Sequence, residues 1–126
     1  MFRRIIIIRK EKPTLDRDEE LQWISDSLGL FNERDKERSC YRIFVELLKE
    51  KKPLRSDDIA LNSRLSRGTV VFHLNKLMDS GLVINEENKY KLREKKVSYL
   101  IKKLRKDVLT TLKEIEEIAK DFETKL

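Results

Sequence analysis

Cysteine and histidine are almost absent from the 126 residues, because each occurs only once, as Cys40 and His73. A single cysteine cannot form an intramolecular disulfide, and one residue of each kind cannot supply the pairs that zinc motifs need. We therefore expect a reducing, cytoplasmic setting and no metal site. Cys40 lies at helical spacing among apolar residues, which predicts a buried small hydrophobe rather than a reactive thiol.

Long apolar runs are also missing. None approaches the roughly 20 residues that span a bilayer, and the apolar block in residues 1–9 is too short for a signal peptide. We expect no membrane association. The sequence shows no nucleophile–base pair, phosphate-binding loop or metal cluster, so we expect neither an enzyme nor a cofactor.

Charged side chains are abundant instead. They make up 41% of the residues against 39% hydrophobic, with a net charge of +6. This balance predicts a small core and long solvated helices. The acidic excess is confined to residues 14–38, with eight acidic and four basic side chains, and the rest of the chain is basic. A basic surface favours a polyanionic partner.

The best-defined helix is predicted at about residues 66–80. Ser66 is a favourable N-cap, and Gly81 suits the left-handed position after the helix. The apolar residues of this helix gather within an arc of about 100°: Val70, Leu74, Leu77 and Met78. Phe72 points away from that arc. A core helix has no need of this orientation, whereas a helix that contacts DNA bases can use it. His73 is expected at the margin of the core, hydrogen-bonded locally.

A strand and a helix are predicted in the first 30 residues. Four consecutive isoleucines predict a strand over residues 2–9, which we expect to join the later sheet or to pair across a dimer. Asp16 predicts the start of a helix that ends at Gly29, with Trp23 as a structural anchor.

Two further helices are expected between that helix and the capped one. Asn32 predicts the cap of a helix over about residues 33–51. Ser56 begins a short helix that ends near Ser63, with Asp57 and Asp58 in its first turn.

Beyond Gly81 the pattern predicts a hairpin and then one long helix. Residues 82–84 form its first strand, and residues 89–93 alternate between an apolar and a basic face. A helix over about residues 94–125 follows. Its heptad positions predict a dimerisation seam, most simply with a second copy: Val97, Ile101, Leu104, Val108, Thr111, Ile115, Ile118 and Phe122. The alternative is that this helix folds back onto the first helix of its own chain.

This order of elements is that of a winged helix-turn-helix. Residues 38–93 resemble ArsR-like and related archaeal and bacterial winged-helix transcriptional regulators. Three stretches carry the resemblance: Ser56-Asp57-Asp58-Ile59-Ala60, then Leu65-Ser66-Arg67-Gly68-Thr69-Val70-Val71-Phe72-His73-Leu74-Asn75-Lys76-Leu77, then Ser80-Gly81-Leu82-Val83.

The resemblance implies that the capped helix enters the DNA major groove. The residues carried over as DNA contacts are Ser66, Arg67, Gly68, Thr69, Val71, Phe72, Asn75 and Lys76, with Lys89, Lys91 and Arg93 on the wing strand. Arg67 suits guanine, Asn75 suits adenine, and apolar side chains suit thymine methyls. Val71 and Phe72 stand where the family often has polar residues, which favours apolar contact. Glu86 and Glu87 would repel phosphates at the wing tip. The family's metal-binding cysteine box is absent.

The expected fold is mainly α with a small β-sheet, in three parts. They are an N-terminal strand-helix extension (residues 1–32), a DNA-binding domain (33–93) and a dimerisation helix (94–126). The expected function is a homodimeric, sequence-specific regulator that binds double-stranded DNA. Two alternatives stay open: a weakly specific chromatin protein and a protein-interaction module. The sequence does not indicate the operator, the sign of regulation or a small-molecule effector.

Overall fold

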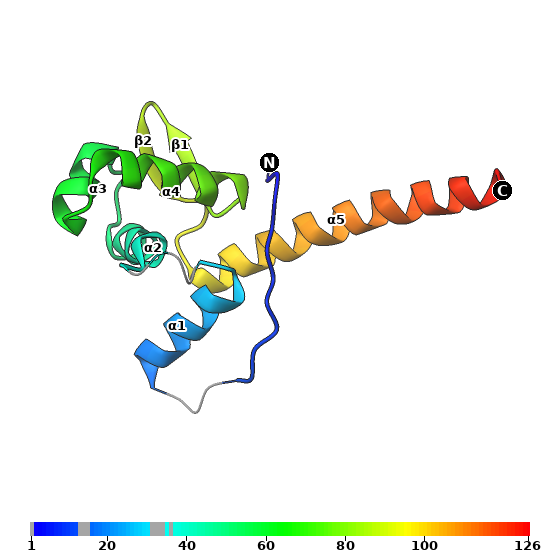
Figure 1. Cartoon of the computed structure of the whole chain (residues 1–126), viewed down its shortest axis with the longest axis horizontal. Coiled ribbons are helices and arrows are strands. Elements are labelled where there is room, and N and C mark those ends of the chain that lie inside the picture. Colours follow the sequence, from blue (N-terminus) through cyan, green and yellow to red (C-terminus); the bar gives the residue numbers. More distant parts are fainter. Residues whose placement is uncertain (1, 13–15, 31–34, 36) are drawn as a thin grey trace. The chain divides into compact units, whose positions relative to one another are not determined.

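The chain folds into helices and one small sheet in two compact units, Met1–Arg93 and Glu94–Leu126. A computed structural model describes residues 2–12, 16–30, 35 and 37–126. Its elements in chain order are α1 (Arg17–Ser27), α2 (Ser39–Lys49), α3 (Ser56–Ser63), α4 (Arg67–Asp79), β1 (Val83–Glu86), β2 (Lys89–Leu92) and α5 (Val97–Thr124) (Figure 1). The mainly helical fold with a small antiparallel sheet confirms the predicted class.

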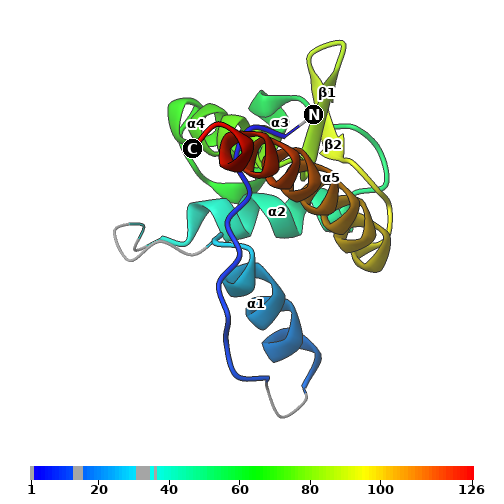
Figure 2. The same ribbon diagram turned by 90° about the vertical axis from the view of Figure 1, so that its right-hand side faces the viewer.

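The core of the first unit lies where α2, α3 and α4 meet (Figure 2). Phe44 of α2, Ile59 of α3 and Leu74 of α4 are completely buried. The Arg42 guanidinium of α2 donates to the Ser63 carbonyl at the end of α3. Such burial of large apolar side chains is the main term that stabilises a domain of this size. It fixes α3 and α4 as a helix-turn-helix pair.

β1 and β2 form the wing, a hairpin with a two-residue turn. Val83 pairs with Leu92, and the register continues antiparallel to Glu86 with Lys89. Glu87 and Asn88 take φ angles of 52° and 64°, as a tight hairpin turn requires. At the base of the wing, the backbone groups of Leu54 and Tyr90 exchange hydrogen bonds of 2.9 and 2.7 Å.

The strand predicted over residues 2–9 does not join the sheet of its own chain, and its pairing across a dimer stays a prediction. This segment contains no strand, and the described sheet consists of β1 and β2 alone. The outer edge of β2 is bridged by Leu54 instead. The segment bonds to carbonyls at two helix ends, at Asp79 and Ser27. Isolated carbonyls of this kind cannot provide the repeated partners of a β-ladder, so the segment forms no strand with its own chain.

The predicted start of the second helix is also wrong. α2 begins at Ser39 because Arg38 adopts a left-handed conformation with a φ of 54°, which interrupts a right-handed helix. Asp35 lies just before, and its carboxylate accepts from the Cys40 N–H at 3.4 Å, a first-turn N–H that needs a partner. The cap predicted at Asn32 and the first residues of that helix, 33 and 34, lie outside the described residues.

The two ends of α1 agree with their local signals. The Asp16 carboxylate accepts from the N–H groups of Asp18 and Glu19 at the start of α1, and Gly29 follows its end with a φ of 71°. Trp23 is the anchor predicted, since its Nε1 donates to the Glu11 carbonyl at 2.6 Å. α5 begins at Val97, three residues later than expected, and continues to Thr124.

Candidate nucleic-acid interface

The N-terminus of α4 is capped by Ser66. Its hydroxyl accepts from the Thr69 N–H at 3.1 Å and donates to the Thr69 hydroxyl at 2.8 Å. The Ser66 hydroxyl is therefore occupied within the protein. Among the described residues, the N–H groups of Arg67 and Gly68 have no hydrogen-bond partner. These two groups, together with the positive end of the helix dipole, are suited to an anion such as a DNA phosphate.

Gly68 lies in open space. A Cβ placed on it would meet no heavy atom within 4 Å. Neither the interior packing nor the backbone conformation of α4 therefore requires glycine at this position. A glycine on an exposed helix face lets another molecule approach the backbone closely.

Arg67 is paired with a carboxylate of the preceding helix. Its Nε lies 3.3 Å from Oδ1 of Asp57, and the two side chains are 75% and 69% exposed. Solvent screening at such exposure leaves little stabilisation from the pair. In this arrangement Nε of Arg67 faces the Asp57 carboxylate of α3. The partnership was not apparent in the sequence, because ten positions separate the residues and no helical spacing connects them.

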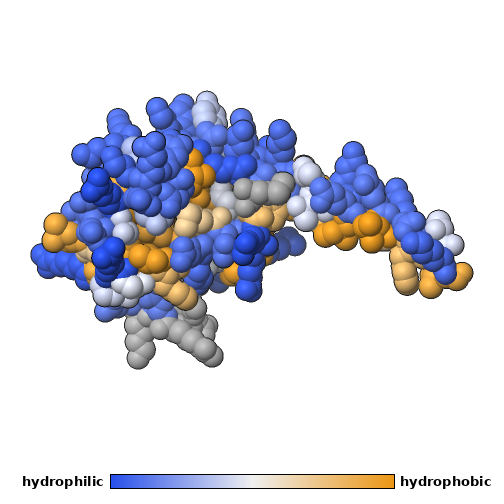
Figure 3. Space-filling model, turned by 90° about the horizontal axis from the view of Figure 1, so that it is seen from above, coloured by the Kyte–Doolittle hydropathy of each residue, from blue (hydrophilic) through white to orange (hydrophobic). Residues whose placement is uncertain are grey.

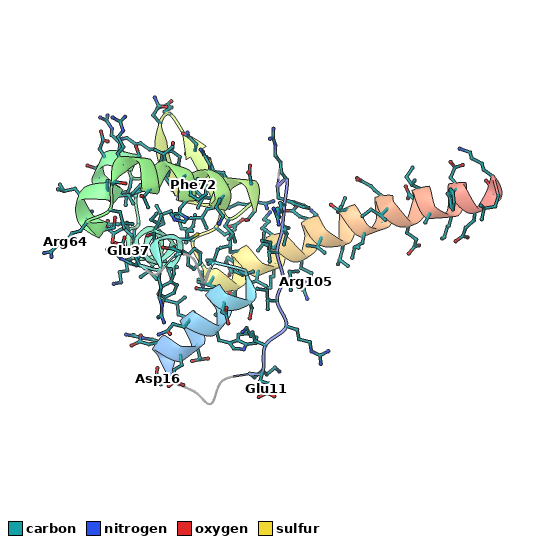
Figure 4. The ribbon with its side chains drawn as sticks, viewed as in Figure 1. Glu11, Asp16, Glu37, Arg64, Phe72 and Arg105 are labelled. Carbon is teal, nitrogen blue, oxygen red and sulfur yellow. The ribbon has the colours of Figure 1, made fainter. Side chains whose placement is uncertain are left out.

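Phe72 stands out from the middle of α4, with 60% of its surface exposed (Figure 4). The Lys76 Nζ lies 5.7 Å from the centre of its ring, within the range of a cation–π interaction. The His73 ring meets Phe72 edge-on, with centroids 5.2 Å apart. An aromatic ring flanked by an ammonium group suits the apolar and anionic parts of a nucleic acid surface. The predicted outward orientation of Phe72 is confirmed.

His73 lies beneath this face and is buried. Its Nε2 is 3.8 Å from Oδ2 of Asp35, which is longer than a hydrogen bond. Its Nδ1 has no hydrogen-bond partner among the described residues, so the predicted local hydrogen bond is wrong for this atom. Burial lowers the pKa of His73 below its usual 6.5, the Asp35 carboxylate opposes this, and the Lys76 ammonium adds to it. Burial outweighs the attraction to Asp35, so the ring is neutral at pH 7.

The basic face of the wing is only partly available. Lys91 Nζ lies 3.2 Å from a carboxylate oxygen of Glu86 on the neighbouring strand. Lys89 is exposed, and it makes no ion pair within the described residues. Tyr90 and Leu92 on the other face are half-buried and buried, as the alternation predicts. Lys89 of β2 is therefore available to bind a phosphate. Lys91 must first break its ion pair with Glu86.

The structure brings most of the predicted contact residues onto one helix. Six side chains or backbones of α4 are exposed or half-exposed along its outer side: Arg67, Gly68, Thr69, Phe72, Asn75 and Lys76. Val71 is half-buried and Arg93 of the wing is half-exposed. We call the outer side of α4 the reading face.

Residues 43–85 match the family described as bacterial regulatory protein, arsR family. No curated protein and no solved structure matches the chain. Within the described residues, no helix has the length and apolarity to cross a membrane. The matched residues run from α2 through α3 and α4 into β1, and thus cover the helix-turn-helix and the first wing strand. Residues 43–85 are therefore an ArsR-like winged helix-turn-helix region, of the type that binds DNA in transcription regulators.

Proposed function

We propose that this regulator binds double-stranded DNA sequence-specifically, with α4 in the major groove and the second wing strand on the phosphate backbone. The observation that carries the proposal is the reading face, where an exposed Phe72, an open Gly68 and an outward Arg67 occur together. A major groove about 12 Å wide admits one α-helix. Arg67 presents the free edge of its guanidinium to guanine, and Phe72 contacts thymine methyls.

We further propose that the active form is a homodimer joined through α5. The second half of this helix exposes a line of large apolar side chains, among them Ile115 at 58%, Ile118 at 69% and Phe122 at 60%. Figure 3 shows hydrophobic side chains along one edge of this half of α5. We therefore place the contact between copies at these exposed side chains of the second half. Leu104 of the first half is buried, and Val97 and Val108 are half-buried.

Selection of bound sequences from random double-stranded DNA tests this function. A sequence-specific homodimer enriches a motif with two-fold symmetry, because each copy reads one half-site. Arg67→Ala is expected to weaken binding to the enriched sequence by about 1–3 kcal/mol, and Phe72→Ala is expected to alter the enriched motif. If Arg67→Ala binds the enriched sequence as tightly as wild type, the assignment of Arg67 fails.

A weakly specific chromatin protein is the second candidate. It is favoured by the apolar Val71 and Phe72 on α4 and by the neutralisation of Arg67 by Asp57, which limit hydrogen-bonded base recognition. The ratio of affinities for the selected and a random duplex at one salt concentration separates the two functions. A regulator typically shows a ratio of about 10³ or more, and a ratio near one supports the chromatin protein.

A further inference from the structure

Arg3 and Arg4 lie at the C-terminal end of α4. The backbone N–H groups of Arg3 and Arg4 both donate to the Asp79 carbonyl, at 2.6 and 2.9 Å. Asp79 is the last residue of α4, and the last carbonyls of a helix have no partner within it. These bonds fix residues 2–4, which we call the arm, beside the end of α4 (Figure 1).

The segment that follows the arm is held at two further points. The Ile8 N–H donates to the Ser27 carbonyl at 2.8 Å, and the Glu11 carbonyl accepts from Trp23. Ile6, which lies between the arm and Ile8 in the chain, contacts Gly29, where an added Cβ would be 2.8 Å from the Ile6 side chain. The position of the arm is therefore set by contacts along the whole segment.

Among the described residues, the charges of the arm have no ion-pair partner. Arg3 and Arg4 are exposed, and within the described part of the chain neither guanidinium has an acidic partner. Arg67 and Lys91, by contrast, are engaged with Asp57 and Glu86. A paired cation must give up its partner to bind a phosphate. An unpaired cation loses only water and counterions when it binds a phosphate, so it contributes more to the free energy of DNA binding.

The length of α4 relates the arm to the width of the DNA groove. From Arg67 to Asp79, α4 rises about 18 Å, which exceeds the groove width of about 12 Å. A helix with its N-terminus in the groove therefore ends near the flanking phosphate backbone. We propose that Arg3 and Arg4 bind phosphates of the strand that borders the groove occupied by α4, an inference that rests on the proposed function.

Paired double variants in the full-length protein test the arm. Arg3→Ala with Arg4→Ala removes two positive charges at the end of α4. Arg9→Ala with Lys12→Ala removes the same charge from the same segment, beginning about 17 Å further along the extended chain. Affinity for one duplex is measured by fluorescence anisotropy over a series of salt concentrations. The arm variant is expected to bind more weakly and to reduce the salt slope of log K by about 1.8, while the control keeps the wild-type slope.

Replacement of both arm arginines by lysine separates charge from structure. Arg3→Lys with Arg4→Lys is expected to restore the slope, because lysine binds phosphate as a point charge. An unchanged slope in the alanine arm variant, an equal loss in the Arg9/Lys12 control or a lack of rescue by lysine overturns the arm proposal. If wild type itself fails to bind any duplex at about 50 mM salt, the proposed function fails instead.

Discussion

Asp57 of α3 and Arg67 of α4 form an ion pair across the helix-turn-helix, with Oδ1 and Nε 3.3 Å apart. The pair links the first turn of α3 to the first residue of α4. Because Nε is occupied, the terminal nitrogens of the guanidinium remain for a bidentate contact to guanine. In the proposed complex the carboxylate also places a negative charge near the DNA phosphates.

Replacement of this carboxylate is expected to change specificity more than affinity. Asp57→Asn removes a charge that repels DNA, so affinity for random duplex rises several-fold. It also releases Arg67, so the ratio of selected to random affinity falls. Asp58→Asn is the matched control, because Asp58 lies in the same turn and makes no ion pair in the described structure. Equal affinity ratios for the two variants would contradict a positioning role for Asp57.

A methyl group at position 68 is expected to stabilise the protein and weaken its DNA binding. Gly68→Ala enters open space in a helix, where alanine is favoured over glycine by about 0.5–1 kcal/mol. The same methyl group would separate the helix backbone from DNA. Thermal unfolding and anisotropy on the same samples measure both effects. Unchanged DNA affinity with raised stability would show that DNA does not approach the α4 backbone at this point.

A charge in the second half of α5 is expected to dissociate the dimer. Ile118→Glu would bury a carboxylate between apolar side chains, which is strongly unfavourable. Thr110→Glu adds the same charge at an exposed position off the heptad seam and is expected to leave the dimer intact. Sedimentation velocity distinguishes the monomer from the dimer for the wild type and for each variant. A wild-type chain that stays monomeric at about 100 µM, well above a Kd of 1 µM, would refute dimerisation.

Stability is expected to fall as the pH drops below about 6.5, because of His73. Burial holds its folded-state pKa below the unfolded value of 6.5, so the unfolded chain binds the proton more readily. The contribution of His73 is therefore fully present above pH 6.5 and is lost as the pH falls toward the folded-state pKa. His73 is the only histidine. His73→Gln should accordingly flatten the dependence of urea unfolding between pH 5.5 and 7, and an unchanged slope would argue against a neutral buried ring.

Cys40 is expected to react with thiol reagents only after unfolding. Burial raises the pKa of its thiol to about 11, and the thiol is enclosed by the core. Little thiolate is present at pH 8, and the thiolate is the reactive form. The reaction of Cys40 with a chromogenic disulfide reagent, followed by absorbance, should be slow in buffer and rapid in urea. Rapid reaction of the folded protein would show that Cys40 is accessible.

Much of the fold followed from signals within a few residues. Asp16 and Ser66 cap α1 and α4 because a side-chain oxygen reaches an N–H two or three residues on. Gly29 and Gly81 follow helix ends with positive φ angles. The outward orientation of Phe72 followed from helical periodicity alone.

Other features required partners distant in the sequence. The isoleucines of residues 2–9 favour an extended chain, but only the tertiary structure decided that Leu54 bridges β2 and that the segment bonds to helix ends. The pair of Asp57 with Arg67 and the unpartnered Nδ1 of His73 depend likewise on how α3, α4 and the turn at Asp35 meet.

The sequence by itself determined the helix-turn-helix, the wing and the residues of the reading face, because caps, turns and periodicity act over short distances. The tertiary structure decided which of the basic side chains are already paired and where the arm lies. Those features depend on distances between elements, which no local pattern encodes.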